Sequence, residues 1–169
     1  MVRVGINART FSVSQPGGEV QSTIKLFSKL IEISSDEFEF IIFGNEKVKA
    51  IFPSNKVVSE GFFVNSQAFG LIWEQTALRH FVKKFNIDVL LCPSANGFFI
   101  KLNNVKSIVW IHDMNAFYEW MNRLYRILSK IRHPRVARSA DIIVTVSNFS
   151  KNEIERLLKI PKSKIKVIY

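Results

Sequence analysis

The sequence predicts a doubly wound α/β domain, in which helices cover both faces of a parallel sheet. Short β-branched runs that are apolar along their whole length alternate with segments whose apolar residues recur at helical spacing. No linker, internal repeat or low-complexity segment divides the 169 residues. We therefore expect one domain over residues 1–169, with right-handed crossovers between its strands.

The first unit of the chain reads as strand, glycine loop and helix. Residues 2–6 are short and apolar, as in a strand buried on both faces, and a Ser/Gln/Pro/Gly-rich loop follows as far as Gly18. A helical period over 20–31 predicts a helix, whereas residues 56–65 are ambiguous. The same patterns predict the other elements: strands over 38–43, 88–92, 107–111, 141–146 and 164–168, and helices over 69–85, 120–138 and 152–158.

Composition and charge favour a cytoplasmic protein with an anionic partner. The single cysteine, Cys92, cannot form an intrachain disulfide, and its apolar surroundings predict a buried, inert thiol. Met1 is not followed by a charged and then apolar leader, and no run reaches the roughly 18 to 20 apolar residues of a membrane span. A net charge of +10 favours binding to nucleic acid, a phospholipid surface or a phosphorylated substrate.

Loops that follow the strands are the candidate functional segments, because open parallel sheets bind ligands at the carboxyl ends of their strands. Four such loops are rich in polar residues or glycine: 7–18, 93–99, 112–117 and 147–150. We therefore expect the functional side chains to lie in these four loops.

Pro16-Gly17-Gly18 lies between the first predicted strand and the first predicted helix. Bare backbone amides at a helix N-terminus form an anion site suited to phosphate. Alternatively, the two glycines only make the turn. Their spacing matches neither the dinucleotide fingerprint nor the phosphate loop of ATPases, which disfavours a dehydrogenase and a P-loop ATPase.

His112 and Asp113 come at the end of a predicted buried strand, where an imidazole and a carboxylate would face a ligand crevice. Adjacent strand residues point to opposite faces, so the two need not act as a pair, and a structural His112 is the alternative. The histidines His80, His112 and His133 are isolated, so we expect no metal site. The absence of a G-x-S-x-G motif disfavours a hydrolase.

The segment Ser147-Asn148-Phe149-Ser150 precedes the last predicted helix. Ser150, with Glu153 three residues later, matches a capping box, which would account for that serine. A strand-to-helix turn of this kind also directs amide groups into the crevice, so capping and ligand binding are compatible.

A basic segment lies between residues 123 and 138, with apolar residues interleaved. Its predicted binding residues are Arg123, Arg126, Lys130, Arg132 and Arg135. The segment is either an ordinary solvated helix face or a surface that docks to an anionic membrane or a phosphate-bearing lipid acceptor. No DNA- or RNA-binding motif accompanies the charge, so we expect no nucleic-acid partner.

In order and spacing, several motifs resemble the N-terminal domain of the retaining glycosyltransferases of family four, a group with the GT-B fold. The motifs are Gly5-Ile6-Asn7-Ala8-Arg9, Pro16-Gly17-Gly18, Trp73-Glu74-Gln75, residues 88–96, Ile111-His112-Asp113, Arg138-Ser139-Ala140-Asp141 and residues 144–150. The resemblance extends over nearly the whole chain, and implies that residues 1–169 are the Rossmann-like, acceptor-side half of a two-domain enzyme.

The resemblance also implies a function and a set of site residues. The second domain of such enzymes binds the nucleotide-sugar, and transfer occurs without a metal or other cofactor. Gly17 and Gly18 would lie beside the donor phosphates and the acceptor, and His112 would contact the donor sugar near the reacting carbon as the catalytic residue. The other implied substrate-binding residues are Asn7, Arg9, Asn96, Asp113, Ser147 and Asn148.

Two departures from the family pattern bear on activity. Glu19 follows the glycine pair, where the family has a small apolar residue, and a carboxylate there would oppose a bound anion. The family continues past a strand like residues 166–169 into its nucleotide-binding domain. We therefore expect the chain to be inactive without a C-terminal domain or a separate partner chain. One alternative is a stand-alone basic binding module that pairs with a separate C-terminal chain or with an anionic membrane surface. Another is a basic surface-binding protein that keeps the fold without the chemistry.

Overall fold

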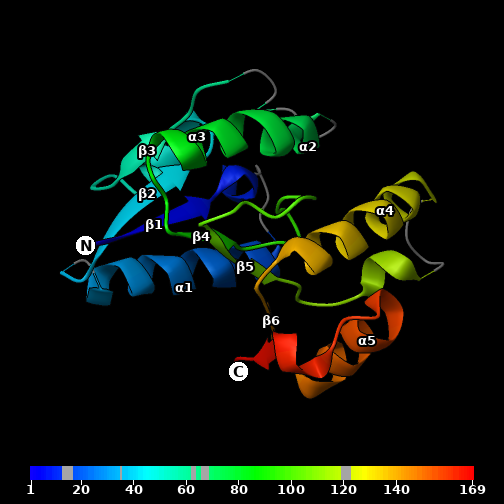
Figure 1. Ribbon diagram of the computed structural model, residues 1–169. Coiled ribbons are helices and arrows are strands. Elements are labelled where there is room, and N and C mark those ends of the chain that lie inside the picture. Colours follow the sequence, from blue (N-terminus) through cyan, green and yellow to red (C-terminus); the bar gives the residue numbers. More distant parts are fainter. Residues whose placement is uncertain (13–16, 35, 62–63, 66–68, 119–122) are drawn as a thin grey trace. The chain divides into compact units, whose positions relative to one another are not determined.

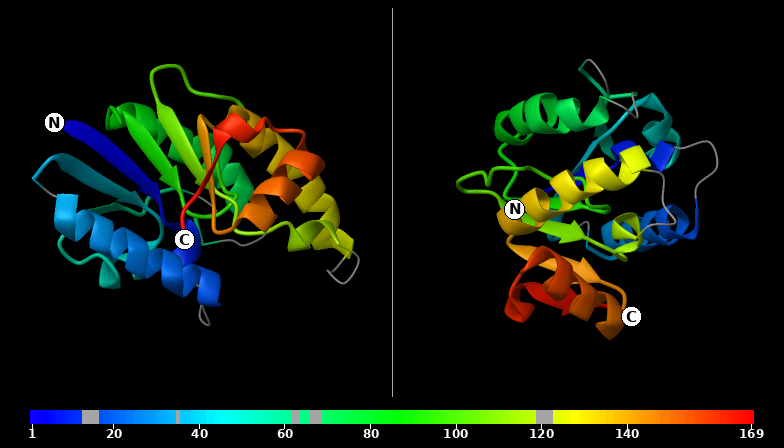
Figure 2. Two further views of the ribbon diagram at one scale, coloured as in Figure 1. Left: turned by 90° about the horizontal axis from the view of Figure 1, so that it is seen from below. Right: turned by 90° about the vertical axis from the view of Figure 1, so that its right-hand side faces the viewer.

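The computed structural model describes residues 1–12, 17–34, 36–61, 64–65, 69–118 and 123–169. The chain forms two compact units, residues 1–93 and 94–169. In each unit helices lie on both faces of parallel strands (Figures 1 and 2). This arrangement confirms the predicted α/β class, whereas a single domain over residues 1–169 stays a prediction.

The described part of residues 1–93 contains four parallel strands in the order β3-β2-β1-β4. The strands are β1 (Val2–Asn7), β2 (Phe38–Phe43), β3 (Lys56–Val58) and β4 (Val89–Cys92). One face is covered by α1 (Gly18–Ser34) and the other by α2 (Gly70–Trp73), a π-helical turn (Glu74–Leu78) and α3 (Arg79–Lys84) (Figure 1). Strand β3 covers the first three of the ambiguous residues 56–65, and the other described residues of that range, 59–61 and 64–65, form no strand.

Phenylalanine builds much of the core of this first unit. The rings of Phe43 and Phe81 stack at 6.5 Å between centroids, and Phe11 lies 6.3 Å from Phe27 and 6.2 Å from Phe52. Such ring pairs contribute about 0.5–1.5 kcal/mol beyond their buried area. A phenylalanine-rich core therefore explains much of the high Phe content.

Residues 94–169 contain three parallel strands in the order β5-β6-β7. The strands are β5 (Lys106–Trp110), β6 (Ile142–Thr145) and β7 (Ile165–Val167). Helix α4 (Arg123–Ser139) covers one face and α5 (Asn148–Leu158) the other (Figure 2). Both helices bury apolar side chains, including Val136 on α4 and Ile154 on α5.

Helix α5 begins earlier than the sequence predicts. Its N-cap is Ser147, whose Oγ accepts a hydrogen bond from the Ser150 N–H at 3.0 Å. The predicted capping box at Ser150 is therefore wrong, because Ser150 is buried inside the first turn and the cap lies three residues upstream. Glu153 instead accepts hydrogen bonds from Arg156.

Within the described residues, no helix combines the length and the apolar character needed to span a bilayer. Helix α4 has 17 residues and is interrupted by polar and charged side chains.

Candidate functional site

Asn7 is the last residue of β1, and Arg9 lies two positions further along the chain. Asn7 is buried and pairs in register with Phe43, the last residue of β2. Arg9 begins a 3-10 turn over Arg9–Ser12, which leads toward the glycine loop. Both residues therefore lie at the carboxyl end of β1, and their role in substrate binding stays a prediction.

The Arg9 guanidinium is held by Glu74. Its Nε and Nη2 each lie 2.9 Å from Glu74 Oε1, and the side chains are only 10% and 0% exposed. Gly70 gives the guanidinium its space, since a Cβ at that position would lie 2.0 Å from Arg9 Nη1. Burial and then the Glu74 charge raise the pKa of Cys92 far above its ordinary value, so the thiol is inert as predicted.

Gly17 and Gly18 are exposed at the start of α1. Neither has a positive φ, and a Cβ added to either would meet no atom within 4 Å in the described structure. The described backbone therefore does not require glycine at either position, which weakens the interpretation that they only make a turn. Pro16, the third member of the predicted motif, lies outside the described residues.

Glu19 occupies the first turn of α1, directly after the glycine pair. A carboxylate in a first turn interacts favourably with the helix dipole, by about 0.3–1 kcal/mol. The main-chain oxygen of Glu19 also accepts a hydrogen bond from Thr23 Oγ1 at 2.6 Å. Helix stability thus accounts for an acidic residue that the family pattern does not predict.

In the second unit, His112 and Asp113 directly follow β5 and are half-buried and exposed, respectively. The main-chain oxygen of His112 accepts a hydrogen bond from Thr145 Oγ1 at 3.4 Å, which ties this loop to the end of β6. The Asp113 carboxylate accepts two hydrogen bonds from Asn115, one from the backbone N–H and one from the side-chain amide, both at 2.8 Å. Asp113 therefore orders the 3-10 turn Asn115–Phe117.

Ser147 and Asn148 lie at the end of β6, where α5 begins. The Ser147 hydroxyl is engaged in capping α5, and Asn148 Nδ2 donates to Tyr169 Oη at 2.9 Å. Next to them, the Phe149 side chain is 75% exposed. Of these two predicted substrate-binding residues, Asn148 is exposed and Ser147 is half-buried.

Helix α4 and the loop before β5 form a contact that joins two separate sequence predictions. Arg132 Nη1 donates to Asn96 Oδ1 at 3.0 Å, and the Arg135 guanidinium lies 5.7 Å from the centre of the Phe99 ring. Ser139 Oγ donates to the Phe98 carbonyl. Arg132 and Arg135 are thus directed toward this loop.

The remaining predicted basic residues of α4 have a different environment. Arg123 and Lys130 are exposed and Arg126 is half-buried. They share the helix with exposed apolar side chains, namely Tyr125, Ile127, Leu128 and Ile131. The basic segment therefore divides into a part that contacts the preceding loop and a part that faces solvent with apolar neighbours.

A cluster of Tyr118, Glu153 and Arg156, which the sequence analysis missed, links the segment between β5 and α4 to α5. Tyr118 Oη donates to Glu153, which also accepts from Arg156 Nε at 3.0 Å. Hydrogen bonding to Glu153 raises the pKa of Tyr118, and the bonds from Arg156 and Tyr118 lower the pKa of Glu153. Tyr118 and Glu153 are 35 positions apart in the sequence, which hid this cluster from pattern analysis.

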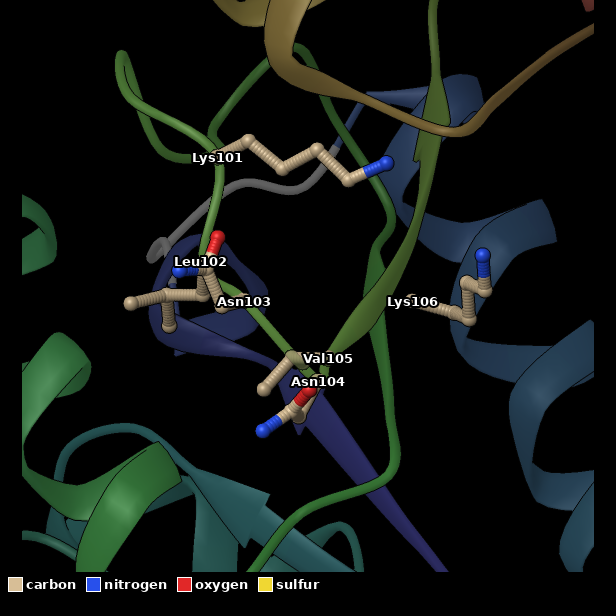
Figure 3. Close-up of a pocket in the computed structure, with 6 residues that line it drawn as sticks. All are labelled: Lys101, Leu102, Asn103, Asn104, Val105 and Lys106. Atoms are coloured by element: carbon tan, nitrogen blue, oxygen red, sulfur yellow. The ribbon is translucent and has the colours of Figure 1, made fainter.

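A surface pocket of about 560 Å³ lies elsewhere, at the loop that leads into β5. It is lined by Lys101, Leu102, Asn103, Asn104, Val105 and Lys106 (Figure 3). Because Lys106 starts β5 and His112 follows its end, the pocket is at the opposite end of this strand from His112. Lys101 and Lys106 both pair with Asp141, so their positive charge is partly neutralised.

Among the described residues, no three His, Cys, Asp or Glu side chains come together in a group that could hold a metal ion. Asn7, Arg9, Gly17 and Gly18 belong to residues 1–93, and Asn96, His112, Asp113, Ser147 and Asn148 belong to residues 94–169. Within the second unit, the hydrogen bond from Arg132 to Asn96 joins a predicted substrate residue to the predicted basic patch.

Parallel strands covered on both faces, with polar residues after their carboxyl ends, define a Rossmann-like α/β fold, and solved structures of glycosyltransferases share it. The chain belongs to glycosyltransferase family 4, whose family model matches residues 36–169. The matched region includes His112 but not Gly17 and Gly18.

Two solved structures share this fold. A glycosyltransferase from Rickettsia africae ESF-5 aligns with 99% of this chain and 42% of its own, at 18% identity and a TM-score of 0.55. The apo form of WaaB, a lipopolysaccharide outer core galactosyltransferase, aligns with 100% of this chain and 45% of its own, at 15% identity and a TM-score of 0.63. The chain therefore spans less than half the length of either structure. Comparison with curated proteins found no match.

Proposed function

We propose that this chain is the acceptor-binding half of a nucleotide-sugar-dependent, retaining glycosyltransferase. The observation that carries the proposal is the family 4 match over residues 36–169, which includes the loops after β4, β5 and β6. The acceptor is a precursor of a cell-surface polysaccharide or glycolipid, and one of the two structural neighbours is itself a lipopolysaccharide galactosyltransferase. No metal or other cofactor takes part in this proposal.

His112 is the proposed catalytic residue and contacts the donor sugar near its reacting carbon. Its position supports this role, because it directly follows β5, is half-buried and has its backbone tied to Thr145. Open parallel sheets bind ligands at such strand ends. In the proposed reaction a glycosyl group moves from a nucleoside diphosphate to an acceptor hydroxyl, with release of the nucleoside diphosphate.

Gly17 and Gly18 are proposed to approach the donor phosphates through their backbone. Both lie at the N-terminus of a 17-residue helix, where backbone amides and the helix dipole favour an anion. Empty space at both Cβ positions leaves room for a ligand. Basic groups that stabilise the leaving diphosphate come from a C-terminal domain or a separate partner chain.

The test replaces His112 by Ala in the sugar-transferring protein, whether one longer chain or a complex. We expect the turnover number to fall by at least about a hundredfold, as for other groups that act on the developing charge of a transition state. His80→Ala is the matched control, because His80 is an exposed histidine on α3. Unchanged turnover in His112→Ala, with turnover in the control also intact, would refute the assigned role.

A second candidate function is docking of α4 to an anionic membrane, at the inner face if the protein is cytoplasmic. The specific observation is that Arg123 and Lys130 share the solvent-facing part of α4 with exposed Tyr125, Leu128 and Ile131. Basic and apolar side chains on one helix suit the interface of an anionic bilayer. This candidate also covers a binding module that acts without transferase chemistry.

Co-sedimentation with phosphatidylglycerol vesicles tests the docking. The chain should bind these vesicles, bind phosphatidylcholine vesicles weakly, and dissociate as salt rises because salt screens exposed charges. Lys130→Gln combined with Leu128→Ser should weaken binding. The control variant carries Lys29→Gln with Ile33→Ser, an exposed basic and apolar pair on α1. Equal binding to both lipids, or equal loss in both variants, would remove the proposal.

A further inference from the structure

Two buried polar atoms lie one turn apart on α4. Ser129 Oγ and Arg132 Nε are both shielded from solvent, and neither has a hydrogen-bond partner among the described residues. Residues three apart on a helix lie on the same side, so both atoms are on the same side of α4. A buried donor without a partner costs about 1–3 kcal/mol, which makes two such donors on one helix side a feature that requires an explanation.

Among the described residues, the Arg132 charge also has no carboxylate partner. No Asp or Glu in the described part of the chain lies within salt-bridge distance of its guanidinium, although the residue is half-buried. Its effect reaches the neighbouring His133, where burial and then the Arg132 charge lower the pKa to about 4. A half-buried guanidinium without a carboxylate is well suited to an incoming anion.

The surroundings of Arg132 hold it in a fixed orientation. Asn96 Oδ1 accepts a hydrogen bond from Arg132 Nη1 at 3.0 Å. The loop that contains Asn96 is itself attached to α4, because Arg135 lies over the Phe99 ring and Ser139 bonds to the Phe98 carbonyl. Asn96 therefore acts as a positioning residue that orients the guanidinium before a ligand arrives.

This part of α4 lies next to the loop that follows β5. The His133 ring meets the Phe117 ring edge-on at 5.6 Å, and Phe117 ends the 3-10 turn that Asp113 orders. Ser129 and Arg132 therefore belong to the same unit as the loop that contains His112. The same stretch of α4 supplies these two donors and the His133 ring that contacts Phe117.

We propose that Ser129 and Arg132, oriented by Asn96, bind a phosphate group of the acceptor. The inference rests on the proposed function and deepens it, since it assigns a chemical class to the acceptor. The Arg132 Nε–H can only donate, and the Ser129 hydroxyl can donate its O–H to the same ligand. A phosphate presents several acceptor oxygens and a negative charge, and so satisfies both donors and the guanidinium charge together.

The experiment titrates the 169-residue chain, labelled with ¹⁵N at its arginine side chains, with inorganic phosphate at constant ionic strength. The Nε–H resonance of Arg132 should shift and saturate, while sodium chloride alone should leave it unmoved. Arg132→Gln should weaken phosphate binding at least about tenfold, the loss expected for a charge-assisted hydrogen bond. Lys166→Gln removes the same charge from an exposed position on β7 of the same unit and should change affinity less than about twofold.

Asn96→Asp is the second variant, and it leaves the Arg132 guanidinium in place. A carboxylate at position 96 would pair with Arg132 and compete with phosphate, so binding should fall while circular dichroism stays unchanged. A short-chain phosphatidic acid, below its micelle concentration, tests whether the phosphate is recognised on a lipid; tighter binding than inorganic phosphate supports a lipid acceptor.

Phosphate binding that is absent, or equal in wild type and Arg132→Gln, overturns the inference even if the transferring protein proves active. Failure of the proposed function appears elsewhere, as unchanged sugar transfer in His112→Ala. The two failures are therefore distinguishable.

Discussion

Arg9 and Glu74 are oppositely charged side chains that are buried together in the first unit, with exposed fractions of 10% and 0%. Arg9→Met would leave the Glu74 carboxylate buried without its guanidinium. We expect the free energy of unfolding to fall by about 3–5 kcal/mol, the usual result of removing one partner of a buried pair. Urea denaturation followed by circular dichroism measures this change.

The matched control for that prediction is Lys29→Met on α1. Lys29 and Glu32 pair on the surface at 2.7 Å, and both side chains are well exposed. Loss of this surface pair should change the free energy of unfolding by less than about 0.5 kcal/mol. The double variant Arg9→Met, Glu74→Leu should regain much of the loss, because no buried charge remains. A loss below about 1 kcal/mol in Arg9→Met would contradict the stabilising role of the pair.

His133 gives the second unit a pH-dependent stability. Burial and the Arg132 charge lower its pKa to about 4, whereas an unfolded chain has an ordinary value of about 6.5. Between these values the unfolded state binds a proton that the folded state does not. The free energy of unfolding should therefore fall as the pH is lowered through this window, by about 3 kcal/mol in total.

Urea denaturation at several pH values from about 7 to about 4 tests the His133 prediction. His133→Gln should flatten this part of the profile, while His80→Gln, at an exposed position, should leave it unchanged. Burial alone would raise the pKa of Asp141, but its lysine partners lower it overall. Asp141 therefore affects the free energy of unfolding mainly at lower pH. A slope that persists in His133→Gln would assign the effect to other groups.

Single residues differ in how far the sequence determined their roles. The burial of Cys92 followed from its apolar neighbours and is confirmed. The partners of Arg9 and Arg132 did not follow from any local pattern, because 65 residues separate Arg9 from Glu74 and 36 separate Arg132 from Asn96. Side-chain pairs of this kind depend on how strands and helices pack, which periodicity does not encode.

At the scale of elements, two glycines at the start of helices have opposite surroundings. Gly70 begins α2 and has the Arg9 guanidinium where its Cβ would be, whereas Gly18 begins α1 with open space around it. Because Glu74 holds the guanidinium, Gly70→Ala must displace that pair and should destabilise the first unit by about 1–3 kcal/mol.

Gly18→Ala is the control for the Gly70 prediction. Alanine loses less backbone entropy than glycine on folding, so this change should be neutral or stabilise by up to about 1 kcal/mol. Thermal denaturation of the two variants measures the contrast. Equal effects of the two substitutions would show that the Arg9 guanidinium moves aside without cost.

Elements with a long apolar period or a fully apolar run were the easiest to predict. The predicted helix over 69–85 is present as α2, a π-helical turn and α3, and the predicted strand over 38–43 matches β2. The start of α5 was missed because Ser147 and Ser150 are both good N-cap residues, and sequence alone did not show which one caps the helix. Strand β3 has three residues, too few for a period-two pattern.

At the scale of the whole molecule, the sequence resemblance predicted the family and the fold, which the family match and two solved structures confirm. The candidate site was predictable only as a set of strand-end loops. Its members divide between residues 1–93 and 94–169, and partners such as Glu74 and Arg132 come from helices whose sequences look like ordinary buried or solvated faces. Roles of individual site residues therefore stay predictions.

The last prediction concerns the 169-residue chain on its own, which spans 42% and 45% of its two structural neighbours. Glycosyl transfer from a nucleotide-sugar releases a diphosphate, and its developing charge needs preorganised positive groups. In our proposal a C-terminal domain or partner chain supplies those groups. Loss of even one such group typically slows a reaction by about a hundredfold to a thousandfold, so the chain alone should show no measurable transfer or donor hydrolysis. Assays with several nucleotide-sugars test this, and turnover abolished by His112→Ala would contradict it.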